Sequence, residues 1–224
     1  MRIVRGLATL LGEGLVTLGV VLLLFVGWQL WWTDVVADAD AATTVGGLQQ
    51  QFAGPGGPGP ERPDQPDLGE AFAIVRIPRF GSGFARPLYE GTTRDVLERG
   101  IGHYAGTQLP GEAGNFAMAA HRTTYGKPFN RIAELRTGDV VLVETRTSWF
   151  VYRVTAHEIV PPSQASVLLP VPNRPGAPAT GRLLTMTSCH PEFSARERYV
   201  VHAELAQTYP HAAGVPDDVL EVTG

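Results

Sequence analysis

The only cysteine of this 224-residue sequence, Cys189, is a candidate nucleophile. The run 183–188 before it reads as a strand, and the His-Pro pair after it ends regular pairing, so we expect the sulfur at the rim of a sheet. A catalytic cysteine needs a base or cation that favours its thiolate, and a donor for the oxyanion that develops on the substrate. A small, inert core thiol is the alternative.

Histidine and arginine are the partners that such a thiol would need. The candidates are His103, His121, His157, His190, His202, Arg196 and Arg198. Although His190 adjoins the cysteine, neighbours on an extended chain point to opposite faces. His121 follows an apolar strand and precedes a turn-rich segment, a position where catalytic groups tend to lie. The residues alone therefore rank His121 first, and a surface or hydrogen-bonded structural role is the alternative for each histidine.

Short runs of β-branched and apolar residues dominate the sequence after residue 70. Strands are expected over 71–77, 116–120, 139–145, 148–157, 183–188 and 198–205, and short helices over 93–99 and 129–135. Closely spaced strands with few helices predict an all-β barrel or sandwich. We expect this folded domain to span 70–207 and to be followed by a loose tail over 208–224.

Residues 1–33 predict a cytoplasmic tip and a transmembrane anchor. Residues 14–32 carry no charge, and at about 1.5 Å per residue they span roughly 28 Å, close to the thickness of a bilayer's hydrocarbon core. Three tryptophans close the run as an interfacial aromatic belt would, and two arginines precede it. This pattern predicts a single-pass membrane protein with a cytoplasmic N-terminus and an extracellular remainder. A cleaved signal peptide is the alternative, but its apolar run is normally shorter.

Residues 34–69 predict an acidic, Pro/Gly-rich linker. They contain six acidic residues and one arginine, for a charge of −5, whereas residues 70–224 contain 15 acidic and 15 basic residues. The Gly- and Pro-rich stretch 54–69 cannot pack a core and predicts an extended spacer. The formal net charge of −4 gives no indication of a basic domain that would bind nucleic acid.

Three separated motifs resemble the sortase family. Thr185-Met-Thr-Ser-Cys189, with Arg198 nine positions later, resembles the TLxTC…R signature, and the run from Gly114 to Gly126 resembles the segment that carries the sortase histidine. The Cys-His-Pro, His-Arg-Thr-Thr-Tyr-Gly and Arg-Tyr-Val-Val-His-Ala runs are similar to class E, the housekeeping type of high-GC Gram-positive actinobacteria. The resemblance covers roughly 71–205 and implies a closed β-barrel of about eight strands with short connecting helices.

The resemblance implies a cysteine transpeptidase. Cys189 would attack between Thr and Gly of a C-terminal LAxTG- or LPxTG-like sorting signal and form a thioacyl intermediate. His121 would act as general acid and then general base, and Arg198 would stabilise the oxyanion or hold the substrate. An amine of a peptidoglycan precursor of the lipid II type would then resolve the intermediate, so that surface proteins become anchored to the cell wall.

The resemblance also implies substrate-binding positions. Tyr104, 17 residues before His121, matches a loop tyrosine associated with the LAxTG preference, and packing of its loop is the alternative. Thr187 and Ser188 before the cysteine are further substrate-binding candidates. We expect no cofactor and no metal site, because the acidic residues of the folded part lack ligand-like spacing.

Two other functions remain open at this point. A cysteine peptidase would use the same residues but release a free acid. A membrane-anchored binding module would carry an inert thiol. A pilus-polymerising sortase is disfavoured, because no second apolar run of membrane length follows Trp32.

Overall fold

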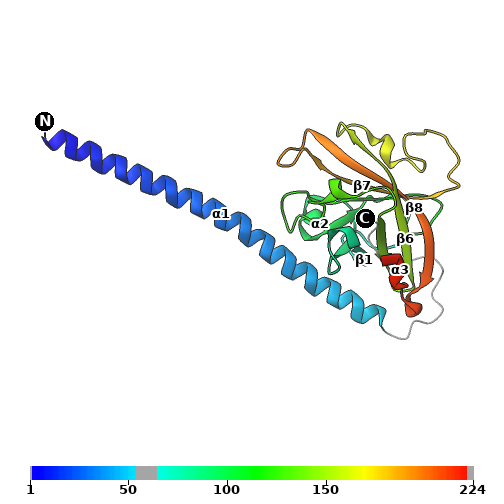
Figure 1. Cartoon of the computed structure of the whole chain (residues 1–224). Coiled ribbons are helices and arrows are strands. Elements are labelled where there is room, and N and C mark those ends of the chain that lie inside the picture. The colour runs from blue at the N-terminus through cyan, green and yellow to red at the C-terminus, as the bar shows by residue number, and fades with distance from the viewer. Residues whose placement is uncertain (1, 54–64, 221–224) are drawn as a thin grey trace.

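The computed structural model describes residues 2–53 and 65–220, which form one long helix and a β-barrel (Figure 1). Helix α1 covers Arg2–Phe52. The strands are β1 (Ala71–Arg76), β2 (Ala85–Glu90), β3 (Ile101–His103), β4 (Gly114–Ala119), β5 (Val140–Glu144), β6 (Ser148–Val160), β7 (Arg182–His190) and β8 (Glu197–Pro210). They close in the order β1-β2-β3-β4-β7-β8-β6-β5. The predicted all-β barrel is therefore confirmed.

Short helical segments lie in the connections of the barrel. They are α2 (Arg94–Arg99), α3 (Asp217–Leu220) and the 3-10 turns η1 (Pro78–Phe80), η2 (Ile132–Glu134), η3 (Ala165–Leu168) and η4 (His211–Ala213). Helix α2 follows Thr93, which has the extended backbone of an N-cap, and ends before Gly100. This short helix lies between β2 and β3, which pair in parallel and so need a crossover connection.

A second parallel pair determines where the functional residues meet. Strands β4 and β7 run side by side from Gly114↔Arg182 to Ala119↔Thr187. Because parallel strands end at the same edge, the residues that follow β4 lie next to the C-terminal end of β7. Apolar side chains such as Phe116, Met118, Leu184 and Met186 fill the barrel below this edge. The edge therefore rests on a packed core.

Two strands were not predicted, and both have weak local patterns. The β2 segment contains Pro87, and β3 is only three residues long. Each is held by its neighbours in the closed barrel rather than by its own alternation. Conversely, β6 and β8 extend to 13 and 14 residues, because each pairs with the other over almost its full length.

Helix α1 continues beyond the apolar run into the segment where we expected a linker. Residues 34–52 are helical, and no proline occurs in this stretch. Ala41, Val45, Leu48 and Phe52 are buried, with the spacing of one helix face, and the last three pack on Ile74 of β1. The Gly/Pro-rich residues 54–64 lie outside the described residues. The first half of the expected linker is thus a docked helix.

The N-terminal half of α1 has the properties expected of a membrane span. It contains a stretch apolar and long enough to cross a bilayer, none of which is buried against the protein. In Figure 1 this half projects away from the barrel.

The expected loose tail is also partly ordered. Strand β8 continues to Pro210, and η4 and α3 follow it. Val219 of α3 is buried against Val140, Leu142 and Val151. The chain therefore packs against β5 and β6 as far as Val219.

Candidate active site

Three neighbouring strands bring Cys189, His121 and Arg198 to one end of the barrel. Cys189 is paired with Arg198 across the antiparallel β7–β8 ladder. On the other side of β7, the parallel pairing with β4 continues through the Ala120 N–H, which donates to the Thr187 carbonyl at 3.3 Å. His121 follows two residues after the end of β4, at the same end of the barrel as Cys189. Cys189 is thus paired with Arg198 at the end of the barrel where the chain leaves β4 and reaches His121.

The Arg198 side chain is oriented by the turn between β7 and β8. Its Nη1 donates to the backbone carbonyls of Ala195 and Glu197, at 3.1 and 2.9 Å. Because directly opposed residues of an antiparallel pair project from the same face, the guanidinium and the thiol share one side of the sheet. Arg196, the other arginine candidate, is exposed and lies in the turn, outside the β7–β8 register.

The His121 ring is half-buried against Tyr125, with 5.2 Å between ring centroids. Its Nε2 is buried and has no hydrogen-bond partner among the described residues. Burial lowers the pKa of His121, the Glu98 carboxylate acts to raise it, and the nearby Arg94 adds to the lowering. A lowered pKa favours the neutral imidazole, which can accept a proton.

Arg122, which our sequence reasoning did not single out as a functional residue, is the buried cation of this site. Only 6% of it is exposed. Its Nη1 lies 3.3 Å from the carbonyl oxygen of Cys189, to which it donates, and 3.1 Å from His190 Nδ1. The guanidinium also lies over the Tyr199 ring, and its Nε is buried without a hydrogen-bond partner among the described residues. The one feature of the sequence that could have pointed to Arg122 is its position directly after His121.

The expected substrate-binding residues occupy two different environments. The Tyr104 hydroxyl reaches across β4 to the Thr187 hydroxyl at 2.9 Å, and the Tyr104 ring is partly exposed. Ser188 is buried, and its hydroxyl donates to the Ala120 carbonyl at 2.9 Å. Tyr104 and Thr187 therefore lie together on the face of Cys189, whereas the Ser188 hydroxyl ties the ends of β4 and β7 to each other.

Two of the other candidate histidines are bound to internal partners near the site. His103 is fully buried between the Glu90 carboxylate and the Gln108 carbonyl. His190 faces Arg122 and Tyr199. Both are therefore held by other residues of the barrel.

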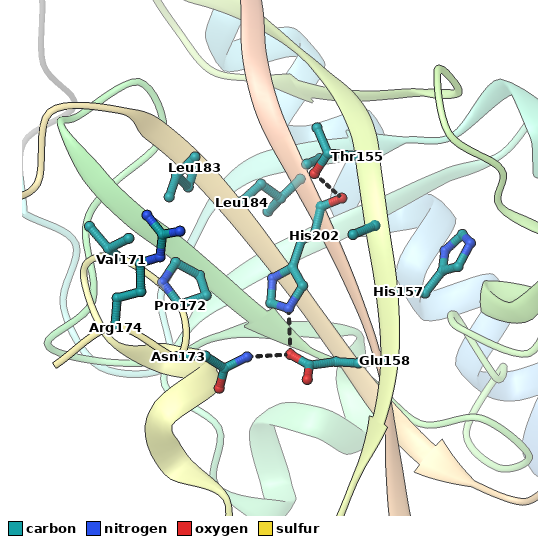
Figure 2. Close-up of a pocket in the computed structure, with 12 residues that line it drawn as sticks. Thr155, His157, Glu158, Val171, Pro172, Asn173, Arg174, Leu183, Leu184 and His202 are labelled. Atoms are coloured by element: carbon teal, nitrogen blue, oxygen red, sulfur yellow. Dashed lines mark hydrogen bonds and ion pairs between the residues drawn. The ribbon is translucent and has the colours of Figure 1, made fainter. Parts of the chain in front are cut away.

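His202 belongs to a separate pocket on the same sheet, which Figure 2 shows. The pocket has a volume of about 440 Å³ and is lined by residues of β6, β7, β8 and the β6–β7 loop. His202 Nε2 lies 2.8 Å from Glu158, which also accepts from Asn173 at 2.7 Å. His202 Nδ1 lies 3.0 Å from the Thr185 hydroxyl. The ring of His157 points away from this cluster (Figure 2).

The acidic residues form ion pairs that are dispersed over the molecule. Asp139 pairs with Arg79, Glu144 with Arg76, and Glu134 with Arg131. Within residues 2–53 and 65–220, no group of three or more His, Cys, Asp or Glu side chains is arranged to hold a metal ion.

Comparisons with known proteins identify this architecture. A family model described as "Sortase domain" matches residues 75–206. The chain is similar to Sortase SrtE1 of Streptomyces coelicolor, with 40% identity over 219 residues, 92% of this chain and 59% of that protein. It is also similar to Sortase SrtE2 of the same organism, with 33% identity covering 92% of this chain and 85% of that one. The chain thus spans less than two thirds of the length of SrtE1.

Solved structures agree with these matches. Sortase E from Streptomyces avermitilis is 42% identical, with a TM-score of 0.63 over 69% of this chain and 99% of that one. The SrtA sortase from Actinomyces oris is 40% identical, with a TM-score of 0.68 over 75% of this chain and 97% of that one.

Proposed function

Because this chain belongs to the sortase family and to its class E, we propose that it is a membrane-anchored cysteine transpeptidase that attaches surface proteins to the cell wall. One observation carries the proposal. The β7–β8 register pairs Arg198 with Cys189, and β4, which runs parallel to β7, ends two residues before His121 at the same end of the barrel. A nucleophile between a proton acceptor and a cationic donor is the arrangement that acyl transfer needs.

Cys189 is the nucleophile in the proposed reaction. Its proton passes to His121 as the sulfur bonds to the carbonyl carbon between Thr and Gly of the sorting signal. The C–N bond then breaks, and the imidazolium of His121 delivers the proton to the leaving glycine amine. Burial lowers the pKa of His121, so the neutral ring is available to accept the thiol proton at the start. Such proton transfer contributes about 10²–10⁴ in rate.

The second half of the reaction uses the same groups in reverse. An incoming amine of a lipid II-type precursor gives up its proton to His121 as its nitrogen bonds to the acyl carbon. The bond between sulfur and carbon breaks, and the proton returns to the thiol. Arg198 stabilises the oxyanion in both halves, and its backbone contacts in the turn hold it in place for that role.

The face that carries Tyr104 and Thr187 binds the sorting signal in this proposal. The Tyr104 hydroxyl oxygen, 2.9 Å from that of Thr187, can accept a hydrogen bond from a substrate amide N–H. Alanine at the second position of LAxTG supplies such an N–H, whereas proline does not. We therefore expect LAxTG to be preferred over LPxTG.

The apolar half of α1 anchors the enzyme in the cell membrane in this proposal. The two N-terminal arginines favour a cytoplasmic N-terminus and a barrel outside the cell, where sorted proteins and lipid-linked precursors are found. We propose no cofactor.

The test uses the full chain in detergent with LAxTG and LPxTG peptides, with and without a diaminopimelate-like amine, followed by mass spectrometry. A thioacyl adduct on Cys189 and an amine-ligated product are expected, with neither from Cys189→Ala. Free acid with every amine tested would indicate a peptidase. No adduct from a folded chain would contradict the proposal.

A further inference from the structure

The second half of α1 docks beside the candidate active site. Asp34 accepts from Lys127 Nζ at 2.8 Å and from the Gly126 N–H at 3.1 Å, and Asp38 pairs with Arg86 at 2.6 Å. Gly126 has a φ of +68°, and a Cβ there would lie 2.9 Å from the Asp38 carboxylate. The helix therefore fits closely against the turn at 124–127.

This turn is connected directly to His121. Tyr125, whose ring packs on His121, has a φ of 53°, and Lys127 has a φ of 38°. With Gly126 they make three consecutive residues with left-handed backbone, which costs on the order of 1–2 kcal/mol per non-glycine residue. Such backbone persists where surrounding contacts hold it, and the carboxylates of α1 supply part of those contacts.

The docked part of α1 begins where its apolar part ends. Trp31 and Trp32 are 60% and 47% exposed, and Asp34 is two residues farther along, a rise of about 3 Å. If the tryptophans lie at the membrane interface, the turn at 124–127 lies at the level of the lipid headgroups. An unbroken helix cannot bend freely between the two, so the anchor also sets the orientation of the barrel.

An exposed aromatic residue lies at the same end of the barrel. Phe193 is 88% exposed, the largest fraction among the large apolar side chains of the described residues. It lies in the β7–β8 turn, four residues after Cys189. Figure 1 shows this orange turn on the side of the barrel toward which α1 projects. A solvent-exposed phenylalanine is unfavourable in water but favourable in a lipid interface.

We propose that α1 is a rigid stalk that holds the catalytic end of the barrel against the outer surface of the membrane, with Phe193 inserted among the lipid headgroups. This inference rests on the proposed membrane anchor. Exposed ion pairs contribute little by themselves, so the buried stripe Ala41, Val45, Leu48 and Phe52 provides most of the docking. The enzyme then acts on acyl donors and amines that are themselves held at the membrane.

The first experiment measures the orientation of the barrel. In a Cys189→Ala background, a fluorophore is attached at Phe193→Cys or, as a control, at Thr180→Cys. Thr180 is exposed and precedes β7 at the opposite end of that strand. The full chain is reconstituted in phosphatidylglycerol vesicles that contain headgroup-nitroxide lipid.

We expect quenching about fivefold stronger at position 193 than at 180, because an interfacial side chain lies within about 5–10 Å of the headgroup boundary. Equal quenching at the two positions, in a chain that stays with the vesicles after an alkaline wash, would overturn the stalk but leave the anchor intact. Loss of the chain in that wash would overturn both.

The second experiment breaks the docking without touching the catalytic residues. Leu48→Glu places a charge in the buried stripe, and Gln49→Glu places the same charge on the exposed side of the helix. The rate with a lipid-tethered sorting peptide is divided by the rate with the soluble peptide.

For Leu48→Glu we expect this ratio to fall about tenfold, because tethering raises the effective concentration only when the site faces the membrane. Quenching at position 193 should fall with it. Gln49→Glu should match the wild type. An unchanged ratio in Leu48→Glu would overturn the stalk, whereas a wild-type chain inactive on both peptides would instead reject the transpeptidase.

Discussion

Two histidines have contrasting surroundings: His202 lies on β8, and His121 follows β4. His202 pairs with Thr185, whereas Cys189 and Arg198 lie four residues farther toward the rim on their respective strands. Both nitrogens of His202 lie within 3.0 Å of a polar side chain. At the rim, His121 Nε2 and Arg122 Nε are buried without hydrogen-bond partners among the described residues.

This difference separates a structural cluster from the proposed catalytic one. Buried polar groups in folded proteins normally have partners, since each unsatisfied group costs free energy of folding. The His202 cluster obeys this rule and ties the β6–β7 loop to the sheet through Asn173 and Glu158. His121 Nε2 and Arg122 Nε do not obey this rule, and they lie at the same end of the barrel as Cys189, the only thiol of the chain. Sites where such rules fail are where binding or catalysis is expected.

The largest expected effect is at His121. In the proposed mechanism this residue accepts the thiol proton, so replacing it with alanine should lower kcat/KM by about 10²–10⁴. Steady-state rates of amine ligation measure this loss, and circular dichroism checks the fold. A wild-type rate in a folded His121→Ala protein would contradict the proposal that His121 is catalytic.

Arg198→Ala should have the next largest effect. Loss of an oxyanion donor typically costs about 10²–10³ in rate, and the loss should appear in kcat more than in KM. Arg196→Ala, two residues earlier and exposed in the turn, is the matched control and should be near wild type. Equal effects of the two changes would argue against a role set by the β7–β8 register.

Arg122→Gln tests whether the buried cation positions Cys189. The change removes the charged donor to the Cys189 carbonyl, and hydrogen bonds from charged groups contribute about 1.5–3 kcal/mol, or about 10–100-fold. We expect kcat to fall by that factor and alkylation of Cys189 to slow. A drop in melting temperature with unchanged kcat and alkylation rate would assign Arg122 a structural role only.

His202→Ala should lower stability and leave the ligation rate almost unchanged, the reverse of the effects expected at the catalytic residues. It leaves Glu158 and Thr185 without their shared partner, so the free energy of unfolding should fall by about 1–3 kcal/mol. The ligation rate of the folded protein should stay within about threefold of wild type, since His202 lies away from Cys189. Denaturant titration and peptide ligation measure the two quantities. A large loss of activity without loss of stability would place His202 with the catalytic groups.

The smallest effects concern the pKa of His121. The Glu98 carboxylate raises this pKa, so Glu98→Gln should lower it further and reduce the protonated fraction at any given pH. Arg94 lowers it, so Arg94→Gln should raise it. NMR titration of the His121 ring measures both shifts, and the acid limb of the rate profile, which needs the neutral ring, should move in the same directions. Shifts of the same sign would contradict the electrostatic account.

The amino-acid sequence alone predicted the class of fold, and it supplied the candidate residues of the site except for the buried Arg122. Cys189, His121 and Arg198 were named from their places at strand ends and from the motifs around them. The strands with clear local patterns were found, and the apolar run in α1 was found from its length and lack of charge. These features are local, so each can be judged from neighbouring residues alone.

Only the tertiary structure determined how these parts meet. The parallel register of β4 and β7 brings residues 68 positions apart together, as in the bond from Ser188 to Ala120. The same pairing brings Arg122 to the Cys189 carbonyl, and residues 34–52 form a helix docked on β1 where composition suggested a linker. Pairing and docking depend on the surface that a distant segment presents. That surface exists only once the barrel has closed, so local composition and periodicity could not reveal these contacts.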